Sequence, residues 1–101
     1  MAIDEREKSG GGWTFLTNHS HILVCLLRNP ELTMREVSAM VGITERATQR
    51  IVADLQAAGV LEIEKDGRRN RYTVRLNCSL RHPLESGHTV GELMQWLERD
   101  N

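Results

Sequence analysis

The chain has 101 residues, of which 40% are hydrophobic and 27% charged, and 13 basic against 14 acidic side chains leave a formal net charge of −1. This composition is typical of one small soluble globular domain and excludes a disordered or fibrous chain. A chain of this length buries a single core and leaves no room for a separate catalytic domain.

Neither a membrane span nor an export signal is expected. The longest apolar run, residues 22–27, is far shorter than the roughly 20 residues that a membrane span needs. Residues 1–12 combine charges with a glycine run, lack the apolar stretch of a secretory signal and are interpreted as a flexible tail. Residues 13–101 then form one domain, for which we expect a cytoplasmic location.

A buried first helix is expected over residues 18–29. It follows a β-branched and aromatic segment, residues 13–17, that fits either a short strand or a lead-in to the helix. Asn18 and Ser20 are the candidate N-caps. Pro30 ends the helix, because the residue before a proline avoids helical backbone angles.

A short capped helix is predicted over residues 33–41. The residues Thr-Met-Arg-Glu at its start match the capping box, in which the first and fourth residues exchange hydrogen bonds. Val37, Met40 and Val41 follow with the spacing of one helix face. Gly42 ends the helix and begins a tight turn.

A longer helix is predicted over residues 45–58, with Thr44 as its N-cap and Gly59 as its left-handed C-terminal residue. One stripe of this helix suits a core, and it consists of Thr48, Val52 and Leu55.

After residue 59 the spacing of apolar residues changes from the helical period of 3.6 to the strand period of 2, which predicts a β-hairpin over residues 60–76. Asp66-Gly67 is the expected turn, and the buried face holds Leu61, Ile63, Tyr72, Val74 and Leu76. After a connector, residues 77–88, a second capping-box match begins a last helix over residues 89–99. Its apolar stripe consists of Val90, Leu93, Met94 and Leu97.

Two helices joined by a turn that contains glycine are the signature of a helix-turn-helix, here residues 33–58. With the apolar stripe turned inward, Arg46, Gln49, Arg50 and the small Ala53 fall on the outer face. Arginine pairs with guanine and glutamine with adenine in the major groove, so we expect base contacts from Arg46, Gln49 and Arg50, with Thr44 at the helix start. A merely solvated face is the alternative.

The hairpin is expected to contact DNA beside this helix. Residues 64–76 hold five basic and two acidic side chains, and the tip carries Arg68, Arg69, Asn70 and Arg71. Such a tip can reach a minor groove or phosphates, and Thr33 and Arg35 are further candidates for phosphate contacts. The alternative is a turn that charge keeps soluble.

Residues 32–76, LTMREVSAMVGITERATQRIVADLQAAGVLEIEKDGRRNRYTVRL, resemble a winged helix-turn-helix of bacterial and archaeal transcription regulators. They are similar to the multiple-antibiotic-resistance and arsenic-resistance repressor families, most specifically in the pattern Leu55-x-x-x-Gly59-Val60-Leu61. The resemblance implies a mainly α fold with a small antiparallel hairpin. It also implies a recognition helix at 45–58, a wing at 64–71 and binding as a homodimer. It implies no ligand, because these families sense many different signals.

The terminal segments are the expected dimer interface. Three of the four aromatic side chains lie there, and they either pack on their own core or meet a second copy across a two-fold axis. The candidate interface residues are Trp13, Phe15, Val90, Leu93, Met94, Trp96 and Leu97.

No enzyme, metal or cofactor is expected. His19 and His21 are two apart and do not share a helix face, and neither cysteine belongs to a paired motif. The arsenic-sensing branch typically carries a cysteine pair that residues 33–42 lack, and Cys25 fits a small buried hydrophobe. No phosphate-binding loop or catalytic-nucleophile motif occurs.

Two functions remain open on the sequence: a transcriptional regulator that binds double-stranded DNA, and a winged-helix module that binds only proteins. The net charge of −1 favours the second slightly. It is unevenly distributed, however, at +2 over residues 45–76, −1 over 1–32 and −2 over 77–101. A small-molecule effector also stays open.

Overall fold

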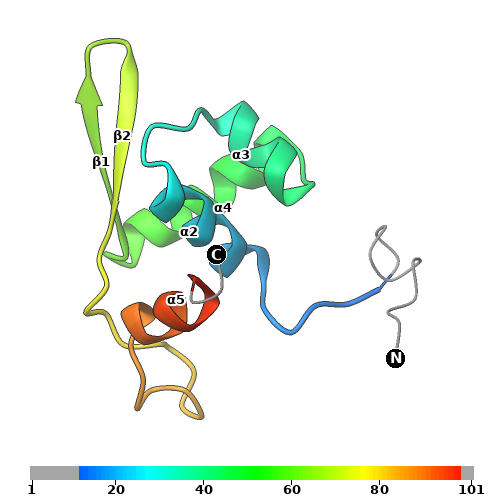
Figure 1. Ribbon diagram of the computed structural model, residues 1–101, viewed down its shortest axis with the longest axis vertical. Helices are drawn as coiled ribbons and strands as arrows, with labels where there is room; N and C mark the ends of the chain where they lie inside the picture. The colour runs from blue at the N-terminus through cyan, green and yellow to red at the C-terminus, as the bar shows by residue number, and fades with distance from the viewer. Residues whose placement is uncertain (1–11, 99–101) are drawn as a thin grey trace.

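The computed structural model describes residues 12–98 and consists of a helical body from which a two-stranded antiparallel hairpin projects (Figure 1). The fold class is as predicted, mainly α with one small hairpin. The elements in chain order are α2 (Asn18–Arg28), α3 (Met34–Val41), α4 (Glu45–Ala57), β1 (Leu61–Asp66), β2 (Arg69–Val74) and α5 (Val90–Glu98). The tail interpretation of residues 1–11 and the last position of the predicted helix 89–99 lie outside the described residues.

Helix α2 forms the centre of the core, with Ile22 and Leu26 almost fully buried. The expected caps are wrong. Thr17 occupies the N-cap without a side-chain hydrogen bond, and Asn18 is already helical. The Oδ1 atom of Asn18 instead lies 2.9 Å from Nδ1 of His21, one turn along. Residues 13–17 form no strand and lead into the helix.

Helices α3 and α4 begin and end within one residue of the predicted bounds, because Thr33 and Ala58 are cap residues. The Glu36 amide donates to Thr33 Oγ1 (3.1 Å) and the Thr33 amide donates to Glu36 Oε1 (2.8 Å), which completes the capping box. Thr44 accepts from the Ala47 amide at the start of α4. Gly42 follows α3 with a φ of +89° in the left-handed region that favours glycine.

The buried face of α3 differs from the prediction at one position. Met40 is 54% exposed, whereas Ser38 is buried together with Val37. Burying a hydroxyl is tolerated when it is hydrogen-bonded, and Ser38 Oγ donates to the Met34 carbonyl and contacts Thr48 Oγ1 of α4. The seam between α3 and α4 is therefore partly polar.

The hairpin turn is shifted by one residue from the prediction. Asp66 is paired with Arg69, so the two loop residues are Gly67 and Arg68 rather than Asp66 and Gly67. Gly67 has a φ of +66° at the first central position, where type II′ turns take glycine. Strand β2 ends at Val74, which leaves Leu76 46% exposed instead of buried.

Helix α5 closes the body against α2 and the exit of the hairpin. The Val90 and Gly91 amides donate to the Cys78 and Leu76 carbonyls at 2.7 and 2.8 Å. A Cβ atom at Gly91 would lie 2.8 Å from the Leu76 carbonyl oxygen, so this approach requires glycine. Among residues 12–98, no helix combines the length and apolar character needed to cross a membrane.

Candidate nucleic-acid interface

The outer face of α4 is the centre of the candidate interface. Thr48, Val52 and Leu55 are buried on its inner face, as predicted. The side chains facing solvent on the opposite side include Arg46, Gln49, Arg50 and Ala53. Two guanidinium groups and one amide, with a small residue beside them, leave this face able to approach the edges of base pairs.

The start of α4 is joined to α3 by an exposed ion pair. Arg35 Nε lies 3.6 Å from Glu45 Oε2, and the Arg35 side chain is 87% exposed. An exposed pair of this kind contributes little to stability, so Arg35 can exchange Glu45 for an external anion at little cost. The Thr44 hydroxyl accepts the Ala47 amide and has no acceptor for its own proton among residues 12–98.

Thr33, expected to contact phosphate, has its hydroxyl engaged within the capping box. It accepts from the Glu36 amide and lies 3.2 Å from Glu36 Oε1, to which it donates. The Thr33 backbone amide and hydroxyl lower the pKa of Glu36, and the charge of Arg69 adds to this effect. Arg69 of the hairpin therefore lies within electrostatic reach of the start of α3.

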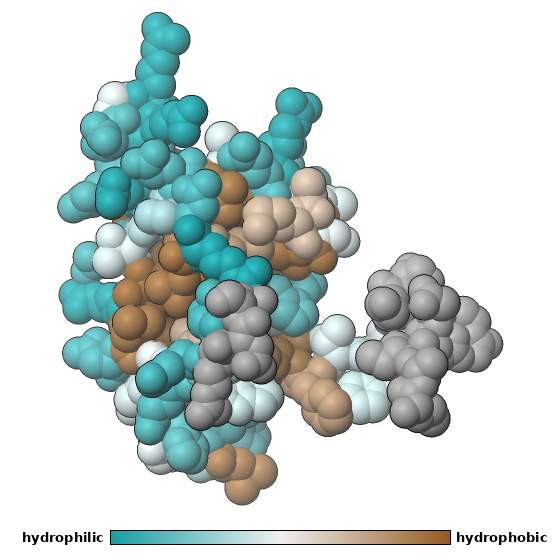
Figure 2. Space-filling view, viewed as in Figure 1, coloured by the Kyte–Doolittle hydropathy of each residue, from teal (hydrophilic) through white to brown (hydrophobic). Residues whose placement is uncertain are grey.

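Some basic side chains of the hairpin are paired with carboxylates, and others are not. Two of them are paired with carboxylates: Arg75 Nη2, at the base, lies 2.8 Å from Glu62 Oε2, and Arg71 Nη1, closer to the tip, lies 3.1 Å from Glu31 Oε2. At the tip, Arg68 is exposed and has no ion pair with residues 12–98. Figure 2 shows the projecting hairpin as hydrophilic along its outer part. Asn70 is exposed and its amide lies 3.4 Å from the Tyr72 hydroxyl.

The residues expected at a dimer interface fall into three groups by exposure. Val90 and Met94 are only 5% and 2% exposed because they complete the core of their own domain. Leu93 and Leu97 are half-buried at its edge. Trp13, Phe15 and Trp96 are exposed, at 74%, 92% and 65%, so the alternative that these aromatics pack on their own core is wrong. Trp13 and Phe15 stack edge to face at 4.8 Å.

The histidines and cysteines form no metal site in the part of the chain described, where no group of three or more His, Cys, Asp or Glu side chains could hold an ion. His19 Nε2 lies 3.0 Å from Asp54 Oδ2. Cys25 is buried as expected, and burial raises the pKa of its thiol.

Sequence reasoning missed the acidic partners of the basic residues. Glu31, Glu45 and Glu62 each pair with one arginine, and one of these pairs, Arg71 with Glu31, joins segments 40 residues apart in sequence. The one available signal was the position of Glu45 in the first turn of α4, which predicts a favourable helix-dipole interaction but no partner.

Comparison with known proteins agrees with this geometry. A family model described as winged helix-turn-helix DNA-binding matches residues 16–62. An uncharacterized protein of Methanocaldococcus jannaschii is 30% identical over 69 residues, which are 67% of this chain but 15% of that protein. The chain thus spans less than a sixth of the length of this curated relative.

A solved structure shares the fold. The PcaV transcriptional regulator from Streptomyces coelicolor, in complex with its natural ligand, superposes with a TM-score of 0.52 at 19% sequence identity. The match covers 94% of this chain and 69% of that one. The family match over α2, α3, α4 and the start of β1, together with the solved structure that shares the architecture, shows that the chain has a winged helix-turn-helix fold.

Proposed function

We propose that the protein is a transcriptional regulator that binds double-stranded DNA as a homodimer. The observation that carries the proposal is the exposed face of α4, where Arg46, Gln49 and Arg50 project away from a buried stripe. In this proposal α4 lies in the major groove and these three side chains contact base edges.

Phosphate contacts are proposed for the residues that flank α4. Arg35 and Glu45 connect the starts of α3 and α4, and the influence of Arg69 on Glu36 connects the wing tip to the same end of α3. These links support one continuous surface that runs from α4 to the wing. Along it we propose phosphate or minor-groove contacts from Thr33, Arg35, Thr44, Arg68, Arg69, Asn70 and Arg71.

The homodimer is proposed on the exposed aromatics. Trp13, Phe15 and Trp96 expose large apolar surfaces that a single domain leaves uncovered, and a second copy of the chain would cover them. A two-fold dimer also presents two copies of α4 to half-sites about one DNA turn apart, roughly 34 Å. The half-buried Leu93 and Leu97 lie on the same helix as Trp96 and extend the proposed interface.

The proposed role is binding and not catalysis, and a cytoplasmic location follows from the need to reach the chromosome. The competing function is a protein-interaction module without a DNA partner, which the overall charge of −1 favours. The exposed arginines of α4 and the wing favour DNA over this alternative.

A mobility-shift assay on mixed genomic fragments separates the two functions. We expect retardation at low salt that weakens steeply at higher salt, because phosphate contacts release counterions. The same assay with the Arg68→Ala, Arg69→Ala double variant should require a higher protein concentration. Absence of retardation at low salt would instead support the protein-interaction module.

A further inference from the structure

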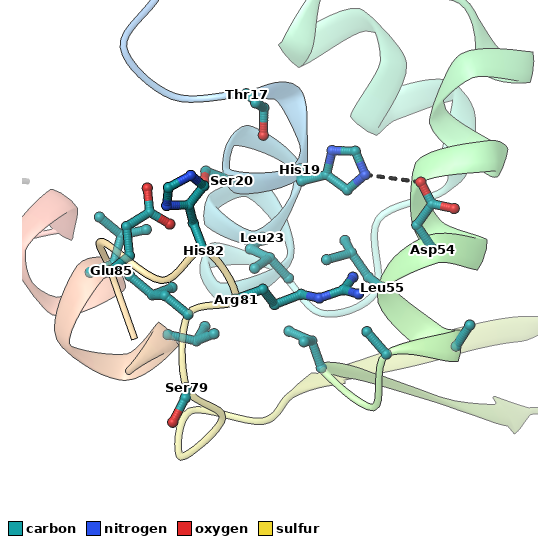
Figure 3. A pocket seen from close by; sticks show the side chains of 16 residues that line it. Thr17, His19, Ser20, Leu23, Asp54, Leu55, Ser79, Arg81, His82 and Glu85 are labelled. Atoms are coloured by element: carbon teal, nitrogen blue, oxygen red, sulfur yellow. Dashed lines mark hydrogen bonds and ion pairs between the residues drawn. The ribbon is translucent and has the colours of Figure 1, made fainter. Parts of the chain in front are cut away.

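A pocket of about 500 Å³ lies at the end of α4 that is remote from the residues proposed to contact bases (Figure 3). Its wall is built from α2, the last turn of α4, the connector before α5, and α5 itself. Small-molecule sites typically have volumes of about 300–1,000 Å³ with a mostly apolar lining and a few polar groups. The winged-helix arrangement by itself assigns no role to this pocket.

The interior of the pocket is apolar. Leu23 of α2, Leu55 and Ala58 at the end of α4, and Val90 and Leu93 of α5 all line it. Leu23, Leu55 and Val90 also belong to the core, so this part of the wall is rigidly packed. A hydrocarbon group placed here would exchange water for the side chains of three helices.

Three hydrogen-bond donors on the rim of the pocket have no acceptor among residues 12–98. Figure 3 shows Arg81 extending across the pocket toward Leu55, and its guanidinium has no ion pair or hydrogen bond with residues 12–98. The Ser20 hydroxyl likewise has no partner there. The Leu84 amide donates to Nδ1 of His82, so the neutral ring carries its hydrogen on Nε2, which is a further donor.

Two carboxylates also lie on the rim, and only one of them is already engaged. Asp54 accepts from His19 at 3.0 Å, as the dashed line in Figure 3 marks. Glu85 has no side-chain partner among residues 12–98, and Figure 3 draws it on the side of the pocket opposite the Arg81 guanidinium. Neither carboxylate pairs with the Arg81 guanidinium, which therefore keeps its donors for an external acceptor.

We propose that this pocket binds a small apolar monocarboxylate. The carboxylate accepts from the Arg81 guanidinium, a charge-assisted and geometrically matched pairing, and the hydrocarbon part covers Leu23, Leu55 and Leu93. The proposal does not depend on DNA binding, and its test contains no DNA, so either proposal can fail alone.

The test uses three ligands that share one hydrocarbon chain: octanoate, octanol and octylammonium. Each is titrated into the isotope-labelled full chain, and backbone amide shifts of pocket residues such as Leu23, Leu55 and Leu93 are followed by NMR. We expect octanoate to bind about fivefold or more tightly than octanol, because an ionised partner strengthens the hydrogen bonds at a half-open rim. Octylammonium should bind most weakly.

Two variants test whether the Arg81 guanidinium is the group that binds the carboxylate. Arg81→Gln should reduce octanoate binding to the level of octanol without changing octanol binding, because only the charged contact is removed. Arg68→Gln makes the same substitution at the wing tip and should leave all three affinities unchanged. The proposal is overturned if octanoate binds no better than octanol, if Arg81→Gln has no effect on octanoate, or if octylammonium binds best because Glu85 and Asp54 dominate the rim.

Discussion

Ser38 of α3 and Thr48 of α4 are joined by a hydrogen bond of 2.7 Å between their hydroxyl oxygens, inside the seam between the two helices. Both residues are buried, at 5% and 0% exposure. Each hydroxyl also lies within hydrogen-bond distance of a carbonyl one turn back in its own helix, Met34 for Ser38 and Thr44 for Thr48. Because two hydroxyls supply only two protons, these protons are shared among the three contacts. The hydrogen bond between the two hydroxyls connects the inner face of α3 to that of α4.

Replacing Thr48 by valine tests how much this contact stabilises the fold. The shape is almost unchanged, but Ser38 loses its partner in α4, so we expect the free energy of unfolding to fall by about 0.5–1.5 kcal/mol. Urea denaturation followed by circular dichroism measures the loss. Thr73→Val, on the exposed side of β2, is the matched control and should change the midpoint little. Equal midpoints for both variants would show that the buried hydroxyl pair contributes no net stability.

Arg50→Ala tests the proposed base contacts of α4. Removing one arginine that pairs with a guanine should cost about 1–3 kcal/mol of specific binding and relax the preference at one base position. Affinities for a selected operator and its single-base variants, measured by fluorescence anisotropy, report both effects. Arg81→Ala removes an exposed arginine at the other end of the body and serves as the control. Unchanged affinity and unchanged base preference for Arg50→Ala would mean that another face reads the DNA.

Arg69→Ala tests the wing tip. Loss of one phosphate contact should weaken binding to all sequences alike and reduce the slope of log K against log salt by about 1. Arg75→Ala is the comparison, because Arg75 is held by Glu62 at the base of the hairpin. We expect a smaller change in its slope. If the two variants have equal slopes, the wing tip has no special role.

The two capping boxes predict a pH dependence of stability. Hydrogen bonds from the Thr33 and Thr89 amides lower the pKa of Glu36 and Glu92 below the ordinary value of 4.5. A lowered pKa in the folded state means stabilisation that is present above this ordinary value and is lost as the pH falls through the folded value.

The double variant Glu36→Gln, Glu92→Gln should therefore melt at a lower temperature than the wild type at neutral pH. The difference should shrink well below pH 4.5, where the glutamates are protonated in both states. Thermal melts at several pH values measure this convergence. Glu64→Gln, an exposed strand position outside the caps, is the control. A difference that stays constant with pH would argue against the carboxylates as its source.

Trp96→Ser tests the proposed dimer. Light scattering of the wild type at micromolar concentration should give twice the 11.5 kDa of one chain, and the variant should shift toward a single chain. Leu84→Ser removes a side chain that is 90% exposed in the connector and should leave the mass unchanged. A wild type that is already monomeric would remove the dimer from the proposed function.

Local sequence signals were sufficient for most of the architecture. The exchange of hydrogen bonds between Thr33 and Glu36 needs only residues within one helical turn, and so does the left-handed conformation of Gly42. The outward placement of Arg46 and Arg50 follows from the period of α4 once its inner stripe is recognised. These features depend on neighbours along the chain, which the sequence displays directly.

Contacts between distant segments decided the rest. Arg71 meets Glu31, 40 residues earlier, and the burial of Ser38 instead of Met40 depends on a hydroxyl that α4 supplies. The pocket around Arg81 exists only because the connector folds back over α2 and α4. The sequence by itself determined the elements, the caps of α3, α4 and α5, and the basic wing. Only the tertiary structure decided which charges are paired and which surfaces stay open, because both depend on side chains that packing brings together from far apart in the chain.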